Sequence, residues 1–358
     1  MYYLHVIHYI AFLGAQTFNA ILAILIVRRA GKLFGAYRNV MLIFTLCSMW
    51  YSLVEILTQP VLHMKGPMCV VFVDHGWFTT ETGNLIVCLH CATFGFIISA
   101  LTAQFFYRYC VLCKPKILKF LNGPNLALIF LPCLVIYAGW FEVVNWGYPA
   151  SPEKREYLRE DLKLIFNADS MTVPLVAPYY WSLGFNGEKL WNLEDLISAG
   201  ICVLIIVKLT FLSVITLSPY QGTLCNMILF FAFNIYWYMK TASVHLSQRT
   251  LELNRQLFLM LSVQTIFPFI TMYIPVGLLI SLPLFNLSLH PYTNYTSASI
   301  ALYPLIEPLI AMCAISDFRK TILRVLGFRK EQSVSSLEVF TMDIVRRRST
   351  TMGTSVIQ

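Results

Sequence analysis

Residues 85–107 read LIVCLHCATFGFIISALTAQFFY, a run that contains no Asp, Glu, Lys or Arg. About 20 mainly apolar residues are enough for a helix to cross the hydrocarbon core of a bilayer, so the run predicts a membrane-spanning helix. The whole chain agrees, because 58% of its 358 residues are hydrophobic and 12% are charged, against about 25% charged in a soluble domain. This composition excludes a cytosolic enzyme, a nucleic-acid-binding protein and a disordered scaffold.

Further runs of similar length suggest that the chain crosses the membrane seven times. They lie at residues 6–27, 39–61, 126–147, 196–218, 257–283 and 297–316, and an additional apolar stretch at 223–239 makes the count ambiguous. Lys and Arg are normally concentrated in cytoplasmic loops. If residues 196–239 form one span and the N-terminus lies outside, most of the 26 basic residues face the cytoplasm. We therefore predict an all-α, seven-transmembrane helix bundle with an outer N-terminus and a cytoplasmic C-terminus.

The bundle is expected to occupy residues 1–328 and to be followed by a flexible, basic cytoplasmic tail at 329–358. Within the bundle, the apolar region 196–240 is about 15 residues too long for one span. Residues 207–221 interrupt this region, and their Val-Lys start and Tyr-Gln end are compatible with the codons of an intron retained in frame. The segment is interpreted either as such an intron or as a true insertion that lengthens the fifth helix.

Two outer loops carry features of their own. Residues 148–195 form the longest loop, and residues 153–163 mix both charge signs at helical spacing, which predicts a solvated helix lying over the bundle. Its simplest role is that of a solubilising lid. Two Asn-x-Ser/Thr sequons begin at Asn286 and Asn294 in the third outer loop, as expected of N-glycosylation sites on an outer surface.

The chain has ten cysteines, and two closely spaced pairs imitate a zinc site. Cys88-x-x-Cys91 and Cys110-x-x-Cys113 match the spacing of a zinc ribbon. The helix between them, however, separates the pairs by about 33 Å, which is too far for one ion to bridge. No metal and no cofactor is therefore expected. Cys110 and Cys113 are interpreted as boundary residues or as palmitoylation sites.

Two glutamates fall inside predicted spans, where a charge is costly and points to a function. Glu55 lies in the outer half of the second span and either lines a ligand cavity, binds an ion, or forms a structural hydrogen-bonded contact between helices. For Glu307, in the middle of the seventh span, we favour a structural or switching role. The ligand-cavity candidates are Tyr51, Glu55, His90 and Thr93. For His90, packing with a hydrogen bond is an alternative to ligand contact.

Tyr107-Arg108-Tyr109 closes the third span at its inner end. Arg108 either extends toward lipid phosphates or acts as a latch whose guanidinium donates hydrogen bonds to a partner. The chain contains no phosphate-binding glycine-rich loop, zinc-protease motif or nucleophile elbow. We therefore do not expect an enzyme.

Several short motifs follow one another in a fixed order along the spans. They are Gly35-Ala36-Tyr37-Arg38-Asn39 with Trp50-Tyr51-Ser52-Leu53-Val54-Glu55, Phe106-Tyr107-Arg108-Tyr109 with Cys113-Lys114-Pro115, Gln256-Leu257-Phe258 with Gln264-Thr265 and Tyr273-Ile274-Pro275-Val276, and Tyr303-Pro304-Leu305-Ile306-Glu307-Pro308 with Asp317-Phe318-Arg319. From about residue 10 to residue 328 this set resembles the nematode seven-transmembrane chemoreceptors of the Str class. Glu307 stands where Asp is more frequent in that class, a difference that keeps the charge.

The resemblance implies a G-protein-coupled olfactory receptor that binds an odorant or another small molecule and signals to a heterotrimeric G protein. It also implies a location in the plasma membrane, in the cilia of chemosensory neurons. Tyr107, Arg108, Tyr109, Glu307 and Arg319 are then the candidates for the switch that couples to the G protein. The disulfide that commonly joins the third helix to the second outer loop cannot form, because residues 148–195 contain no cysteine. A bond between Cys69 and Cys88 remains an open possibility.

The alternative is a transporter or channel for a small solute. Such a protein needs a path of ionisable groups through the bundle. Two buried glutamates without a buried base make a poor proton relay, which favours the receptor.

Overall fold

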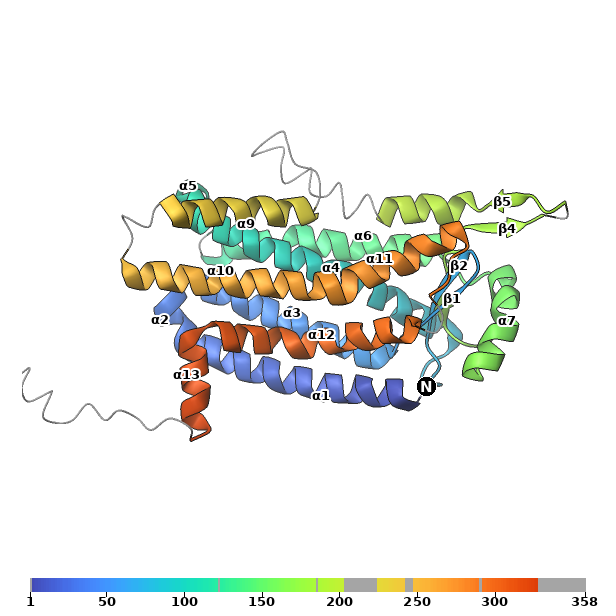
Figure 1. Cartoon of the computed structure of the whole chain (residues 1–358), viewed down its shortest axis with the longest axis horizontal. Coiled ribbons are helices and arrows are strands. Elements are labelled where there is room, and N and C mark those ends of the chain that lie inside the picture. The colour runs from blue at the N-terminus through green and yellow to red at the C-terminus, as the bar shows by residue number, and fades with distance from the viewer. Residues whose placement is uncertain are drawn as a thin grey trace, which may run out of the picture. The chain divides into compact units, whose positions relative to one another are not determined.

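The computed structural model describes residues 2–121, 123–184, 186–202, 224–241, 247–289 and 292–327. The chain divides into two compact units, Met1–Ile315 and Ser316–Gln358. In the second unit the described part contains helix α13 (Ser316–Val325). The first unit is a bundle of long helices that run side by side, with small β-sheets and one further helix at one end (Figure 1).

Helices supply most of the first unit. Along its first half they are α1 (Tyr2–Leu25), the π-helix η1 (Ile26–Ala30), α2 (Gly31–Phe34), α3 (Tyr37–Thr58), α4 (Thr80–Cys113), α5 (Pro115–Leu118), the 3-10 helix η2 (Gly123–Ile129) and α6 (Leu131–Gly147). In the second half they are α7 (Pro152–Phe166), an unlabelled helix at 193–202, α9 (Leu224–Thr241), α10 (Gln248–Pro268), the π-helix η4 (Phe269–Tyr273), α11 (Ile274–Ser281), η5 (Leu282–Phe285) and α12 (Thr293–Ala314).

Six of the described helical segments are long and apolar enough to cross a membrane, and they coincide with six of the predicted spans. The fifth predicted span is represented by the helix at 193–202 and by α9. The proposed intron or insertion at 207–221 lies outside the described residues. The third span is longer than predicted, because α4 continues to Cys113. Arg108 therefore lies more than a turn before the end of its helix.

The outer surface of the bundle is apolar, as expected for helices surrounded by lipid. Large apolar side chains remain exposed on the outside of the bundle, including Leu13, Leu134 and Ile270, each at least 53% exposed. In a membrane such surfaces contact lipid instead of water. Helix α4 is the opposite case: it is buried along most of its length and packs against α3, α6 and α9. It forms the central helix of the bundle.

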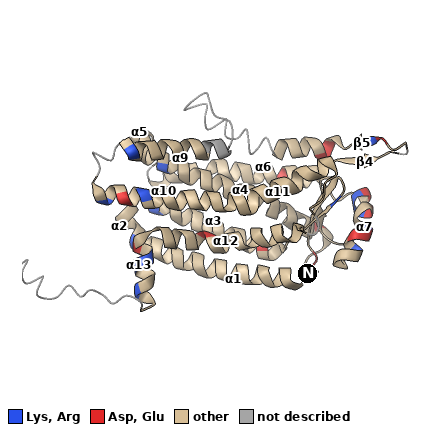
Figure 2. Cartoon of the chain, viewed as in Figure 1, with Lys and Arg blue, Asp and Glu red and all other residues tan. Residues whose placement is uncertain are grey.

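The two ends of the bundle differ in charge and in structure. We call the end with Tyr2, the β-sheets and α7 the sheet end, and the other the basic end. In the first unit, Lys and Arg residues gather at the basic end, whereas α7 carries both signs (Figure 2). This is the asymmetry on which the predicted topology rests.

A three-stranded sheet that we did not predict closes the sheet end. Strand β1 (Val61–Lys65) pairs with β2 (Met68–Phe72) through a two-residue turn, and β2 pairs with β3 (Leu175–Val176). The second span was predicted to reach residue 61, but α3 ends at Thr58 and β1 follows. A shorter hairpin of β4 (Trp181–Leu183) and β5 (Lys189–Trp191) lies beyond.

The hairpin of β1 and β2 is buried on both faces. Successive side chains of a strand point to opposite sides. Val61, Val70 and Phe72 pack against α7 on one side, whereas Leu62 and Met64 pack on the other side against the helices of the bundle. The hairpin is therefore a layer between the bundle and α7, and it forms a roof over the space between the helices.

The predicted helix at 153–163 exists as α7, but it is not simply solvated. Its N-terminus is capped by Ser151, whose side chain accepts a hydrogen bond from the Lys154 amide. Leu158 and Leu162 are fully buried against the hairpin. Lys154 and Arg155, which the charge pattern placed in solvent, are 4% and 8% exposed. The lid is thus packed into the protein and not loosely draped over it.

Candidate functional site

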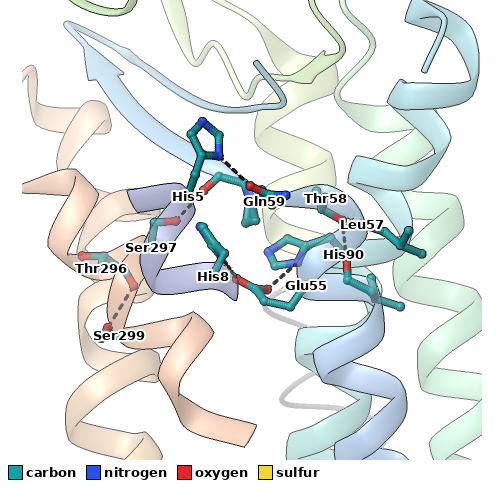
Figure 3. A network of polar contacts seen from close by, with 12 residues as sticks. His5, His8, Glu55, Leu57, Thr58, Gln59, His90, Thr296, Ser297 and Ser299 are labelled. Carbon is teal, nitrogen blue, oxygen red and sulfur yellow. Dashed lines mark hydrogen bonds and ion pairs between the residues drawn. The ribbon is translucent and has the colours of Figure 1, made fainter. Parts of the chain in front are cut away.

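A cluster of buried ionisable groups joins α1, α3 and α4 near the sheet end (Figure 3). Glu55 on α3 lies between two imidazoles: its Oε1 is 3.4 Å from His8 Nδ1, and its Oε2 is 3.1 Å from His90 Nδ1. All three side chains are almost completely buried. One turn further along α3, Gln59 Oε1 lies 2.6 Å from His5 Nδ1. The cluster ties the first three spans together.

The arrangement explains how a carboxylate is held in an apolar bundle. Burying an ionised group costs several kcal/mol unless a partner compensates its charge. An imidazole lies on either side of Glu55 as a polar partner, and each carboxylate oxygen faces its own imidazole. Of the alternatives for Glu55, the geometry favours the structural contact between helices. For His90, the structure shows a packed imidazole 3.1 Å from Glu55 Oε2, and the hydrogen bond that the sequence suggested stays a prediction.

Next to this cluster, beneath the hairpin, lies a packed group of apolar and aromatic side chains. Tyr51, one turn before Glu55, meets Tyr303 of α12 edge to face, with 6.1 Å between ring centroids. Leu62 and Met64 of the hairpin belong to the same apolar group. Among the described residues, the buried hydroxyls of Tyr51 and Tyr303 have no hydrogen-bond partner. Unpaired buried hydroxyls are uncommon, so this group has an unmet capacity for hydrogen bonds.

The fourth ligand-cavity candidate does not join the others. Thr93 is buried, but its hydroxyl donates to the Leu89 carbonyl at 2.7 Å and lies 3.4 Å from the hydroxyl of Tyr137 on α6. Tyr51, Glu55 and His90 are therefore neighbours, whereas Thr93 faces the interface between α4 and α6.

Glu307 occupies a contact between helices in the middle of the bundle. It lies on α12 between Pro304 and Pro308 and is 1% exposed. Gln264 of α10 donates a short hydrogen bond to its Oε1. Asn19 of α1 donates to the Pro304 carbonyl, at 3.0 Å. These contacts fit the structural or switching role that we favoured, because they connect α12 to two neighbours.

At the basic end, Arg108 is buried between helices. Its side chain is 5% exposed, and its Nη2 donates to Asn254 Oδ1 of α10 at 2.5 Å. The guanidinium also lies 5.0 Å from the ring centroid of Tyr37, a cation–π contact. Tyr107 stacks on the same ring, with 5.8 Å between centroids. Arg108 thus connects α4 to α3 and α10, as a latch does.

The remaining switch candidates make contacts of their own or belong to the other compact unit. Tyr109 packs against Phe230 and Phe231 of α9, with ring centroids 5.8 and 5.1 Å apart. Arg319 belongs to α13, in the second compact unit. The structure therefore brings Tyr107 and Arg108 together, and it places Tyr109 on another face of α4.

The cysteines in the part of the chain that the structure describes are free thiols. Cys69 and Cys88 are both free, so the possible bond between them does not form. No group of three metal-binding side chains occurs among the described residues. Asn286 is exposed in the loop after η5, whereas Asn294 lies in the first turn of α12 and is half-buried.

Several residues of these sites were missed by sequence reasoning. His8 and Gln264 look like isolated polar residues on apolar helices, and only the fold shows that Glu55 and Glu307 are their partners. Lys154 was missed because its neighbours are charged. The hairpin had a readable signal: Gly66-Pro67 stands between two runs rich in Val and Met, which is typical of a turn between strands.

These features define a class of protein. Apolar helices form a membrane bundle, one end holds a roofed cluster of aromatic and polar groups, and the other end holds a buried arginine contact between helices. This combination is that of a multi-pass helical membrane receptor. The chain belongs to the family described as serpentine type 7TM GPCR chemoreceptor Str, which it matches over residues 4–323.

Named relatives agree with this family. The chain is 27% identical to the "Serpentine receptor class r-10" of Caenorhabditis briggsae over 320 residues, which cover 88% of each chain. It is 28% identical to the protein of the same name from Caenorhabditis elegans over 311 residues, 85% of this chain and 86% of that one. It is 24% identical to "G-protein coupled receptor str-33" of C. elegans, with 94% and 93% covered.

The protein is therefore a seven-transmembrane chemosensory G-protein-coupled receptor and not an enzyme. The resemblance read from the motifs is confirmed. The transporter alternative is not supported, although one reason given against it was wrong. Glu55 does have buried bases beside it, namely His8 and His90. These three groups sit together near one end and connect helices, so they form a contact cluster and not a path across the bundle.

Proposed function

We propose that the receptor binds an odorant or similar small molecule within the aromatic group beneath the hairpin, in contact with Tyr51 and Tyr303. The observation that carries this proposal is the pair of buried tyrosine hydroxyls without a partner, inside an otherwise apolar group. Such surroundings suit a mainly apolar molecule with one hydrogen-bonding group. Glu55 and His90 shape the wall next to it, with Glu55 acting mainly through its two imidazoles.

The contacts of α12 suggest how binding reaches the other end of the bundle. Tyr303 and Glu307 lie one turn apart on this helix, and Glu307 is held by Gln264 of α10. The same α10 carries Asn254, which accepts from Arg108. We propose that a ligand on Tyr303 favours a state in which the contact between Glu307 and Gln264 and that between Arg108 and Asn254 are rearranged. Binding then shifts a two-state equilibrium toward the form that recognises a G protein.

The sheet end is proposed to face outward and the basic end to face the cytoplasm. The support is the concentration of Lys and Arg at the basic end. A heterotrimeric G protein then meets the Arg108 side. We further propose that the receptor is olfactory and resides in the plasma membrane of a sensory cilium, a location that the family suggests and that imaging of a tagged receptor tests.

Tyr303→Phe and Tyr51→Phe test the ligand site. Each removes a hydroxyl that has no partner in the folded protein, so we expect surface levels to stay unchanged. Loss of one hydrogen bond to the ligand is expected to weaken potency about 3- to 10-fold. The measurement is a calcium dose–response curve with an agonist found in a panel of small volatile and water-soluble compounds.

Tyr180→Phe is the matched control, because its hydroxyl is also buried without a partner but its ring lies outside this aromatic group. Equal potency for the Tyr303→Phe, Tyr180→Phe and unaltered receptors would contradict the proposed site.

The exposure of the two sequon asparagines predicts which of them carries a glycan. Asn286 is exposed in a loop, whereas Asn294 is half-buried in the first turn of α12. We expect endoglycosidase treatment to increase the gel mobility of the unaltered receptor and of Asn294→Gln, but not that of Asn286→Gln. A mobility shift that depends on Asn294 instead would show that the assignment is wrong.

A further inference from the structure

A cavity of about 410 Å³ lies at the basic end, where α1 gives way to α3. Its wall includes Arg28, Gly31, Gly35, Ala36, Arg38 and Asn39. Among the described residues that line the cavity, the ionisable groups are two arginines and none is a carboxylate. The Gly35-Ala36-Tyr37-Arg38-Asn39 motif forms one side of the cavity, and neither the ligand site nor the Arg108 latch uses this motif's Gly35 or Arg38.

The local backbone builds the cavity. The last turns of the first span widen into the π-helix Ile26–Ala30, a form that is frequent at functional sites. Gly35, with a φ of +56°, lets the chain reverse before α3. At Gly31, a Cβ would lie 2.9 Å from Arg38 Nη1, so the absence of a side chain lets the guanidinium lie close to the helix. Gly31 therefore leaves room for the Arg38 guanidinium beside the helix.

The charges of the cavity are uncompensated. Within the described residues neither Arg28 nor Arg38 forms an ion pair, and the contact of Arg38 Nε with Asn39 Oδ1 is long, at 3.5 Å. Helix α3 also begins here, with Ala36 as an N-cap that offers no side-chain acceptor, and a helix N-terminus carries partial positive charge. Paired guanidinium groups bind phosphate through parallel hydrogen bonds.

We propose that the Arg28–Arg38 cavity binds the phosphorylated headgroup of an anionic lipid. The cavity lies at the end of a membrane span, where headgroups are found. Next to it, Ile24 and Val27 are more than half exposed, and these apolar side chains offer a surface along which acyl chains can lie. A lipid uses both the arginines and this apolar surface, whereas a free phosphate ion uses only the arginines.

That the lipid comes from the cytoplasmic leaflet rests on the orientation proposed above, but binding itself does not. The test uses the full-length receptor in nanodiscs, in which both leaflets carry the same lipids. One set contains phosphatidylcholine with phosphatidylinositol 4,5-bisphosphate, and the other contains phosphatidylserine at equal total charge. Native mass spectrometry counts the bound lipids, and no agonist or G protein is needed, so failure of the signalling proposal leaves this test unaffected.

We expect the phosphorylated inositol lipid to bind at least tenfold more tightly than phosphatidylserine, and Arg28→Gln or Arg38→Gln to remove most of this preference. Gly31→Ala leaves the charge unchanged but displaces Arg38, so it should weaken binding severalfold. Arg29→Gln is the matched control: it removes the same charge one residue away from Arg28, and Arg29 does not line the cavity.

Two results would overturn the proposal. If Arg29→Gln weakens binding as much as Arg28→Gln does, binding reflects a general attraction of basic residues to anionic membranes and not a specific site. If soluble inositol 1,4,5-trisphosphate or inorganic phosphate competes with the lipid at equal concentration, the cavity binds phosphate but the lipid source is wrong. Preference for the lipid with a selective loss in Arg38→Gln and Gly31→Ala supports the proposal.

Discussion

Lys154→Met is expected to remove most of the receptor from the cell surface. Lys154 Nζ on α7 lies 2.9 Å from each carboxylate oxygen of Asp195, and these side chains are 5% and 1% exposed. Burial raises the pKa of Asp195, and the ammonium opposes this rise. Methionine leaves the carboxyl group buried without that compensation. Removing one partner of a buried ion pair typically costs about 3–5 kcal/mol.

The same pair anchors three segments at the sheet end. Asp195 Oδ2 also accepts from the amide of Tyr179, at 2.6 Å, and from Asn192 Nδ2, at 3.2 Å. Asp195 lies near the start of the helix at 193–202, in the second predicted outer loop. The ion pair therefore links α7 to the beginning of the fifth span and to the chain before β4. The ion pair thus fixes a loop that has no cysteine with which to form a disulfide.

Surface labelling of matched control variants distinguishes loss of the Lys154–Asp195 ion pair from a general effect of removing a charge. Arg159→Met removes one positive charge from the same helix, but its pair with Glu156 is about 60% exposed on both sides, and such pairs contribute at most about 1 kcal/mol. We expect near-normal surface levels for that variant. Adding Asp195→Asn to Lys154→Met should restore part of the loss, because no unpaired charge remains. A double variant as poorly expressed as Lys154→Met would contradict the argument.

The spans could be predicted from sequence because lipid imposes a simple requirement on length and polarity. Six of them coincide with the apolar helices of the structure. The hairpin of β1 and β2 was missed because it is buried on both faces. Its strands therefore lack the polar and apolar alternation that reveals a half-exposed strand. Its apolar start was instead read as the end of a helix.

The candidate sites show the same limit at the level of single residues. Glu55, His90 and Arg108 could be selected because a buried charge or imidazole is costly and therefore noticeable. His8 and Asn254 could not, because their roles depend on which side chains face them across the bundle. On α7 the mixed charges were typical of a solvated helix, and no local pattern reveals that Lys154 and Arg155 turn inward. For Arg155, the partners are the backbone carbonyls of Ala150, Ser170 and Val173.

Arg108→Ala and Asn254→Ala are expected to change signalling in opposite directions. The contact between Arg108 Nη2 and Asn254 Oδ1 holds α10 against α4 in the structure described. If this is the inactive state, Asn254→Ala frees α10 and raises signalling without ligand. A hydrogen bond to a charged group contributes about 1.5–3 kcal/mol, which corresponds to a shift of roughly 10- to 150-fold in the equilibrium between states.

Arg108→Ala removes more than this latch. It also deletes the guanidinium that lies over Tyr37 and that we propose to contact the G protein once it is released. We therefore expect ligand responses to be abolished or strongly reduced at matched surface levels. Arg108→Lys keeps the charge but not the planar group that stacks and donates in several directions, so its response should remain well below normal.

The measurements are basal and agonist-evoked G-protein activation, each divided by the amount of surface receptor. Arg255→Ala is the control, since Arg255 is the exposed neighbour of Asn254 on α10 and its loss should change neither value. If the contact is a latch, Asn254→Ala must raise basal signalling and Arg108→Ala must lower evoked signalling. If Asn254→Ala and Arg108→Ala both lower evoked signalling and leave basal signalling unchanged, the contact stabilises the fold of the basic end and is not part of the switch.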